Sequence, residues 1–540
     1  MRLTKSGCLA LGLIVFSWSF ASVHAQSAAE VERQVLQLFQ QRCSDCHGLK
    51  PTKFTKPKRP QLDAATDLLA LLNNPKYVTA GSAINSVLFK RVTLPFQDED
   101  RMPQSTDDDR REPLTTAQIA LLKQWIEPPI VVNRPFVKDQ AVVEIIEKDL
   151  LAAAPANRPY LRYLTLQNLY NSGDSDANLE IYRAGLNKLV NSLSVEDEIT
   201  RLQPVDPNRL VLRLDLRNYY WTADLWEHFV KGYPYAIKYV LRSESHVAEM
   251  TGSPLAYLRG DWFAFAASQP PLYNLFQVLE TDRKLEDAFS LEVAGNIRKG
   301  VAKRTGFAVS GVSQQNRMIE RHPLLHGGKA GGPTPDGWYW KSYDFKSSDG
   351  KQNLFANPLG PASLGNHLAF EHNGGEIILG KANGLQLYML VTAKGDRLDR
   401  APTAIVNDPG RADSAIINGI SCMKCHAEGM RVAPKGNLDD ELRPAALKAL
   451  SLTPEDENLL KALYPEPPAM RALYEHDVQK FKDALLKCGA GVTPEPISFL
   501  YDRFLAPITR STFPSEFGLE GCSAMPGDQW RRPAAVSWAL

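Results

Sequence analysis

Apolar residues recur at helical spacing in the first 130 residues. Residues 28–41 place four of them on one helix face: Val31, Val35, Leu38 and Phe39. A second helical run covers residues 64–72, and a capping-box pattern at residues 115–118 opens a third helix. We therefore expect residues 26–129 to form an all-α domain.

The pattern becomes mixed from residue 130. Residues 160–170 and 177–193 have helical spacing, whereas residues 210–217 alternate leucines with other residues, as in a strand with one buried face. Asn383-Gly384 is a tight-turn signal between two further apolar runs. Residues 130–405 are therefore predicted to form an α+β domain with antiparallel sheet.

The last part of the chain returns to helical spacing. Residues 438–450, 454–463 and 468–486 each predict a helix. The predicted fold class is multidomain: an all-α domain, the α+β domain, and a helical C-terminal part over residues 406–540.

The N-terminus has the pattern of an export signal. Arg2 and Lys5 precede a mostly apolar run from Cys8 to Phe20, and Val23-His24-Ala25 supplies small residues before a cleavage point. No later run approaches the ~18 apolar residues that span a bilayer. We expect residues 1–25 to be a signal peptide, and the mature chain to be periplasmic or secreted, without a transmembrane segment.

Charge gives little guidance about partners. Without Arg2 and Lys5, 60 of the 62 basic side chains remain against 61 acidic ones, and 44% of residues are hydrophobic. A balanced chain of this composition packs cores but has no excess charge that attracts nucleic acid or an anionic membrane.

Two copies of the pattern C-x-x-C-H carry the strongest chemical signal: Cys43-Ser44-Asp45-Cys46-His47 and Cys422-Met423-Lys424-Cys425-His426. In this pattern two thiols form thioethers to haem, and the adjacent imidazole binds the iron. A redox-active thiol pair, half a zinc site and chance are the alternatives. Two copies in a chain with an export signal favour two covalently attached haems c.

The first iron also needs a ligand opposite His47. Met102 lies in a polar loop before Pro103, and a thioether in that position raises the haem potential. A methionine used only to fill a core is the alternative.

Further landmarks follow Cys43–Gly48 in order: Gly81 to Leu88, Arg91-Val92, Asp100 to Pro103, and Leu114 to Ile126. Together they resemble the planctomycete-type cytochrome c domain, a small class I-like cytochrome c whose haem has His/Met ligation. The resemblance covers about the first hundred mature residues and implies roles for Cys43, Cys46, His47 and Met102. The whole chain resembles an exported diheme c-type cytochrome.

The distal ligand of the second iron stays open. Among the histidines, His372 and His322 rank first because both fall in the region expected to pack on this haem, and His476 is third. His326 and His367 rank lower, and Met430 is too close to His426 to reach the opposite side. An iron with no protein ligand on that side is the fourth possibility.

Cys488 and Cys522 remain after the two motifs and the signal segment are set aside. An even remainder in an oxidising compartment predicts a disulfide between them. Two buried thiols are the alternative.

Three functions fit these observations. The first is an exported diheme cytochrome that exchanges electrons with a soluble or membrane-bound redox partner. The second is a diheme peroxidase- or oxidase-like enzyme that acts on a small molecule at the second haem. The third is a secreted haem-containing binding or sensor module.

Overall fold

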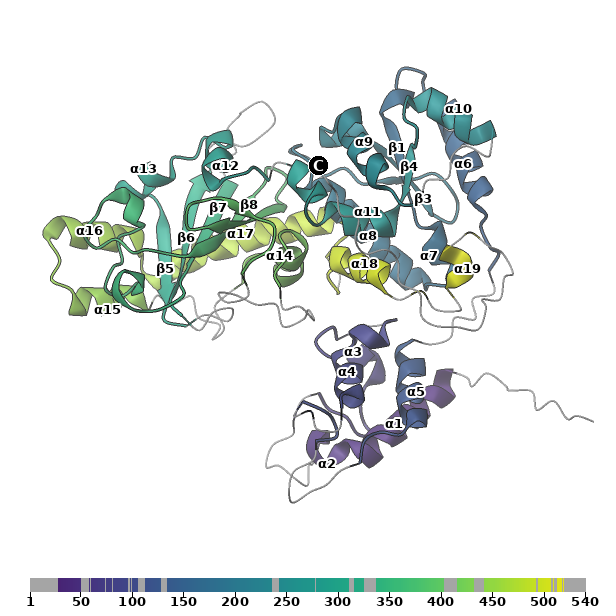
Figure 1. The fold of residues 1–540 in the computed structure, drawn as a ribbon, viewed down its shortest axis with the longest axis horizontal. Coiled ribbons are helices and arrows are strands. Elements are labelled where there is room, and N and C mark those ends of the chain that lie inside the picture. Colours follow the sequence, from purple (N-terminus) through teal and green to yellow (C-terminus); the bar gives the residue numbers. More distant parts are fainter. Residues whose placement is uncertain are drawn as a thin grey trace, which may run out of the picture. The chain divides into compact units, whose positions relative to one another are not determined.

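A computed structural model of the chain describes residues 28–518, except residues 50–57, 59, 73, 80, 96–97, 99, 105–111, 128–133, 236–241, 277, 310–314, 325–336, 403–414, 432–440, 492–493, 507, 509–511 and 517. The chain divides into two compact units, residues 1–129 and 130–540. In Figure 1 the first unit is purple to blue and the second runs from blue through teal to yellow. The predicted signal peptide lies outside the described residues.

The elements described in the first unit are helices. They are α1 (Ala28–Arg42), α2 (Ser44–His47), α3 (Leu68–Leu72), η1 (Ala83–Asn85), α4 (Val87–Thr93) and α5 (Thr116–Ile126). The apolar face predicted for α1 is buried, and Phe39 meets Trp125 of α5 edge to face. The predicted capping box is confirmed: Gln118 N–H donates to the Thr115 hydroxyl, and Thr115 N–H donates to the Gln118 side chain.

In the second unit, the described strands form two sheets. The small sheet has the order β2-β3-β1-β4, from β1 (Leu161–Thr165), β2 (Gln203–Pro204), β3 (Val211–Asp215) and β4 (Tyr257–Arg259). The large sheet has the order β10-β9-β8-β7-β6-β5, from β5 (Lys303–Phe307), β6 (Arg317–Leu324), β7 (Gly337–Asp344), β8 (Gly374–Gly380), β9 (Gln386–Thr392) and β10 (Arg397–Leu398). The pairings are antiparallel except for β1 with β4.

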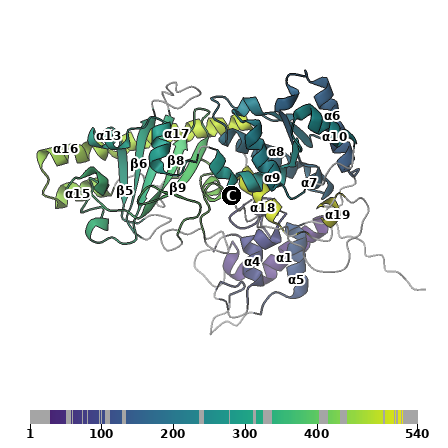
Figure 2. The same ribbon diagram turned by 45° about the horizontal axis from the view of Figure 1, so that its top comes forward.

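Helices of the second unit come from both ends of its sequence. Before the large sheet they are α6 (Asp139–Ala152), α7 (Gln167–Asn171), α8 (Asp176–Ser192), α9 (Ala223–Gly232), α10 (Arg242–Thr251), α11 (Gly260–Ala267), α12 (Asp282–Ala288) and α13 (Val293–Arg298). After it they are α14 (Ile420–Cys425), α15 (Leu442–Ala449), α16 (Pro454–Leu463), α17 (Pro467–Cys488), α18 (Pro496–Leu505) and α19 (Phe513–Glu516). Figures 1 and 2 show α15 and α16 beside the β5 edge of the large sheet. No helix in the described part of the chain is long and apolar enough to cross a membrane.

The two faces of the large sheet are covered by helices from different parts of the chain. On β7, Trp340 Nε1 donates a hydrogen bond to Asp477 of α17 over 2.8 Å. The hydroxyl of the preceding residue, Tyr339, donates a hydrogen bond to Glu286 of α12 over 2.9 Å. Because successive side chains of a strand point to opposite faces, α17 and α12 lie on opposite sides of β7.

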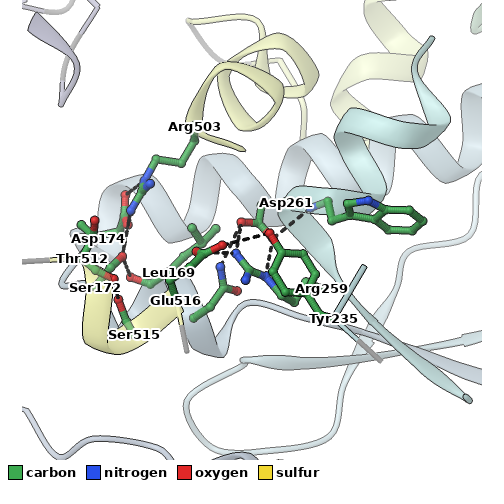
Figure 3. Close-up of polar contacts among 12 residues, drawn as sticks. Leu169, Ser172, Asp174, Tyr235, Arg259, Asp261, Arg503, Thr512, Ser515 and Glu516 are labelled. Atoms are coloured by element: carbon green, nitrogen blue, oxygen red, sulfur yellow. Dashed lines mark hydrogen bonds and ion pairs between the residues drawn. The ribbon is translucent and has the colours of Figure 1, made fainter. Parts of the chain in front are cut away.

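The C-terminal helix α18 packs against α8 and α11. Figure 3 shows Arg503 of α18 pointing toward Asp174, which its guanidinium contacts at 2.9 Å beside the N-terminus of α8. In the same view Glu516 of α19 faces Arg259, and their closest atoms are 3.0 Å apart. Helices α18 and α19, near the end of the described chain, therefore pack against elements from the start of the second unit.

The predicted fold class is wrong. The structure is mixed α/β with a four-stranded and a six-stranded sheet among the described residues, and an N-terminal all-α cytochrome domain is not shown. The described residues of the predicted helical C-terminal part do form helices, but α17 and α18 pack into the same compact unit as the sheets. The reason is that α17 packs on α8, and α18 packs on α8 and α11, which are earlier elements of the sequence.

Candidate functional site

Both C-x-x-C-H segments form a single helical turn. His47 N–H donates to the Cys43 carbonyl over 2.9 Å, and His426 N–H donates to the Cys422 carbonyl over 2.8 Å. Residues three and four apart in a helix lie on one face. Each segment therefore presents its two thiols and its imidazole toward the same side.

The two imidazoles are held in the same way. Nδ1 of His47 lies 3.0 Å from the Pro60 carbonyl oxygen, and Nδ1 of His426 lies 3.1 Å from that of Gly429. A carbonyl only accepts, so Nδ1 must donate, and Nε2 is left as the nitrogen with a lone pair. Metal-binding histidines are typically oriented by such a bond.

The protonation state of His47 also suits a ligand. Burial lowers the pKa of its imidazole below the usual value, and nearby Lys58 lowers that pKa further. Only the neutral imidazole binds a metal ion.

A cavity of about 600 Å³ adjoins the second motif. It lies against one face of the large sheet, and Cys422, Cys425 and His426 form part of its wall. Its volume is within the range of pockets that hold cofactors. The motif therefore opens onto a space of suitable size for a bound group.

The cavity wall has apolar and polar parts. Leu390, Leu398 and Ile416 contribute to the apolar part. At the polar part Arg317 Nε lies 3.0 Å from Asp344 Oδ1, and burial raises the pKa of this carboxyl group. Haem has an apolar ring, which the apolar side chains can cover, and two carboxylates, which cations of the wall such as Arg317 can bind, so these residues fit the group.

Glu376 of β8 also lines the cavity. Its Oε2 lies 3.6 Å from His426 Nε2. Burial alone would raise the pKa of this carboxyl. The positive charge that His426 has when its imidazole is protonated, together with hydrogen bonds from His426 and Cys422, outweighs burial and lowers the pKa to about 2. An acidic side chain thus faces the nitrogen that would bind iron.

The environment of Cys422 argues against a redox-active thiol pair. Its side chain is buried, and burial followed by the charge of Glu376 raises the pKa of the thiol well above the usual value. A redox-active cysteine typically has a lowered pKa. Among the described residues, no group of three or more His, Cys, Asp and Glu side chains is arranged to hold a metal ion.

Met102 is partly buried against the apolar core of the first unit, as is Cys43. Its backbone N–H donates to the Arg91 carbonyl over 2.7 Å, which ties the loop to α4. Both residues therefore belong to one core, and ligation by Met102 stays a prediction.

The two leading histidine candidates lie away from the cavity wall. His322 is fully buried, with Nε2 2.9 Å from Glu320 Oε1 and Nδ1 3.4 Å from Asn296 Nδ2. Its side chain lies on the opposite face of β6 from Arg317 and Ile319, which line the cavity. His372 packs against Tyr343, with ring centroids 4.9 Å apart, and burial lowers its pKa to about 4.

The other candidates are placed as follows. His367 and His476 have largely exposed side chains, 65% and 49%, and His326 lies outside the described residues. Cys488 is buried at the end of α17, but Cys522 lies outside the described residues, so the disulfide stays a prediction.

Glu376 is the site residue that the sequence analysis missed. It stands before the apolar residues Ile377, Ile378 and Leu379, and a lone carboxylate in such a strand is a signal that could have been followed. Comparison of the chain with models of protein families, with curated proteins and with solved structures finds no match.

Proposed function

We propose that the chain carries two covalent haems c and transfers electrons through them to a redox partner outside the cytoplasm. The observation that carries this proposal is the shared geometry of the two motifs, in which one helical turn aligns both thiols with an imidazole whose Nδ1 is held by a backbone carbonyl. The cavity beside the second motif supports it for that site.

The residues of the chain have defined tasks in this proposal. Each cysteine thiol adds across a vinyl group, so that a carbon–sulfur bond forms and the hydrogen goes to the neighbouring carbon. His47 and His426 would hold the iron through Nε2, and Met102 would supply the second ligand at the first site. The bound haem supplies a reversible one-electron change at iron. The apolar part of the cavity wall would cover the ring of the bound group.

Mass spectrometry of the intact protein tests the proposal. The protein is expressed in a host that attaches haem c, and its mass is expected to exceed that of the bare mature chain by two haems. C43S/C46S and C422S/C425S are each expected to remove one haem. C488S is the matched control and is expected to retain both. A parent protein with the mass of the bare chain contradicts the proposal.

The second candidate function is peroxidase- or oxidase-like chemistry on a small molecule at the second haem. The specific observation in its favour is the cavity itself, whose wall carries the buried carboxyl of Asp344 and the carboxylate of Glu376. Carboxyl groups beside a reactive centre serve as proton donors and acceptors. Binding of carbon monoxide by the reduced protein separates the two functions, because a pure electron carrier with both irons fully ligated binds none.

A further inference from the structure

We propose that Glu376 is the protein group that faces the second iron on the side opposite His426. This inference rests on the proposed haem attachment at Cys422 and Cys425. In this proposal a carboxylate on β8, and not one of the candidate histidines, lies opposite His426. The second iron would then have a different pair of neighbouring side chains from the His/Met pair proposed for the first.

The distance between the two side chains is the first argument. Imidazole and carboxylate bonds to a metal ion are each about 2.0–2.2 Å in zinc sites, so two such ligands on opposite sides of one ion are about 4 Å apart. Glu376 Oε2 lies 3.6 Å from His426 Nε2. Because Nδ1 is engaged by Gly429, the nitrogen that faces Glu376 is the one that binds iron.

The rigid placement of Glu376 is the second argument. Its backbone is held in place because the Glu376 N–H donates a hydrogen bond to the Ser342 hydroxyl over 2.8 Å. Next to it, a Cβ added to Gly375 would lie 2.0 Å from the Ser342 carbonyl oxygen, so β8 and β7 approach closely here. The side chain is 18% exposed and points to the cavity face of the sheet.

The other candidate ligands of the second iron are engaged by other residues or lie on the same side as His426. His322 is engaged by Glu320 and Asn296 on the opposite face of the sheet, and His372 packs against Tyr343. Met430 lines the cavity, but it follows His426 by four residues, and its carbonyl accepts a hydrogen bond from Tyr474 over 2.6 Å. That contact ties the Met430 backbone to α17, and the short spacing keeps Met430 beside the His426 segment.

The test compares E376A and E376Q with H372Q and M430L in the full-length, haem-loaded protein. Intact mass first establishes that both haems are attached. The oxidised absorption and electron paramagnetic resonance spectra then report the ligands of each iron, and cyanide titration reports access to the second iron. We expect both Glu376 variants to change the second-haem spectrum and to bind cyanide at least about tenfold more tightly, whereas H372Q and M430L match the parent.

Two results overturn the inference. One is a set of parent-like spectra and cyanide affinities in both Glu376 variants with two haems attached. The other is a changed second-haem spectrum in H372Q or M430L alone. If E376A loses haem or fails to fold, the spectra and cyanide affinity of E376Q decide the question, because glutamine keeps the size of the side chain. A parent protein without a second haem would instead refute the proposed function, and the mass measurement separates the two failures.

Discussion

Arg321 and Asp477 form a two-pronged ion pair although they are 156 residues apart in the sequence. The guanidinium Nε and Nη2 donate to the two carboxylate oxygens over 2.8 and 2.9 Å. Both side chains are buried, and the Asp477 carboxylate also accepts the Trp340 indole N–H. This pair holds α17 against β6 and β7, on the same face of the large sheet as the cavity.

Replacement of Asp477 by alanine is therefore expected to destabilise the second unit strongly. Removing one partner of a buried ion pair leaves the other charge uncompensated, which typically costs about 3–5 kcal/mol. Chemical denaturation measures this free energy of unfolding. Asp483→Ala on the exposed side of the same helix is the control and should change it by less than about 0.5 kcal/mol. Equal stabilities of the two variants would show that the pair does not hold α17.

Two helical glycines should respond oppositely to alanine. A Cβ at Gly185 of α8 would lie 2.5 Å from the Pro496 carbonyl oxygen, whereas the nearest atom to a Cβ at Gly295 of α13 is 3.5 Å away. Gly185→Ala is expected to cost about 1–3 kcal/mol because α8 and α18 must separate. Gly295→Ala is expected to gain up to about 1 kcal/mol from helix propensity. Thermal and urea unfolding of the two variants check this contrast, and a stabilised Gly185→Ala would contradict the close approach.

Glu516 should stabilise the second unit through Arg259. Its carboxylate contacts the buried Arg259 guanidinium at 3.0 Å and accepts a hydrogen bond from the Tyr235 hydroxyl over 2.9 Å (Figure 3). Glu516→Gln removes the charge and is expected to cost about 1–3 kcal/mol. Glu475→Gln, at an exposed position of α17, is the matched control. Urea denaturation measures both, and a neutral effect of Glu516→Gln would contradict the prediction.

The free energy of unfolding is expected to depend on pH because of Lys381. Its ammonium group is buried and donates to the Ser192 carbonyl over 3.0 Å, and burial lowers its pKa from 10.5 to about 7. Between these two values the unfolded chain binds the proton more tightly than the folded chain does. The contribution of Lys381 to stability therefore increases as the pH rises from about 7 toward 10.5.

The size of this effect is measurable. Relative to Lys381→Met, which has no charge to titrate, the parent should gain roughly 2 kcal/mol of unfolding free energy between pH 7 and pH 9. Urea unfolding of both proteins at the two pH values gives the difference. Parallel changes in the two proteins would show that Lys381 does not keep a lowered pKa in the folded state.

The local patterns predicted only part of this fold. The alternation at residues 210–217 marks β3, and Asn383-Gly384 marks the turn between β8 and β9. The predicted helix over residues 160–170 is wrong at its start, because Leu161–Thr165 is strand β1. Every residue of β1 is buried, so no alternation of polar and apolar positions reveals it.

Strand β6 shows why charged residues can hide a strand from sequence analysis. It contains Arg317, Glu320, Arg321 and His322, a composition that does not suggest a buried position. Arg304 and Asp477 supply the opposite charges, and neither is a neighbour in the sequence. The two C-x-x-C-H motifs are local and were found from their spacing. Glu376 meets His426 only through the sheet, so the sequence analysis missed it.

The packing of α18 on α8 and α11 sets an order of events during synthesis. Domains tend to fold as units while the chain emerges from its N-terminus, and the core around α8 and α11 stays open until residues 496–505 have been made. Cys422 is only 2% exposed once that core has closed, and α14 itself contacts α18. A group that is to be attached to this thiol would therefore have to reach it before α18 docks, and a chain that closes too early would keep an unmodified Cys422.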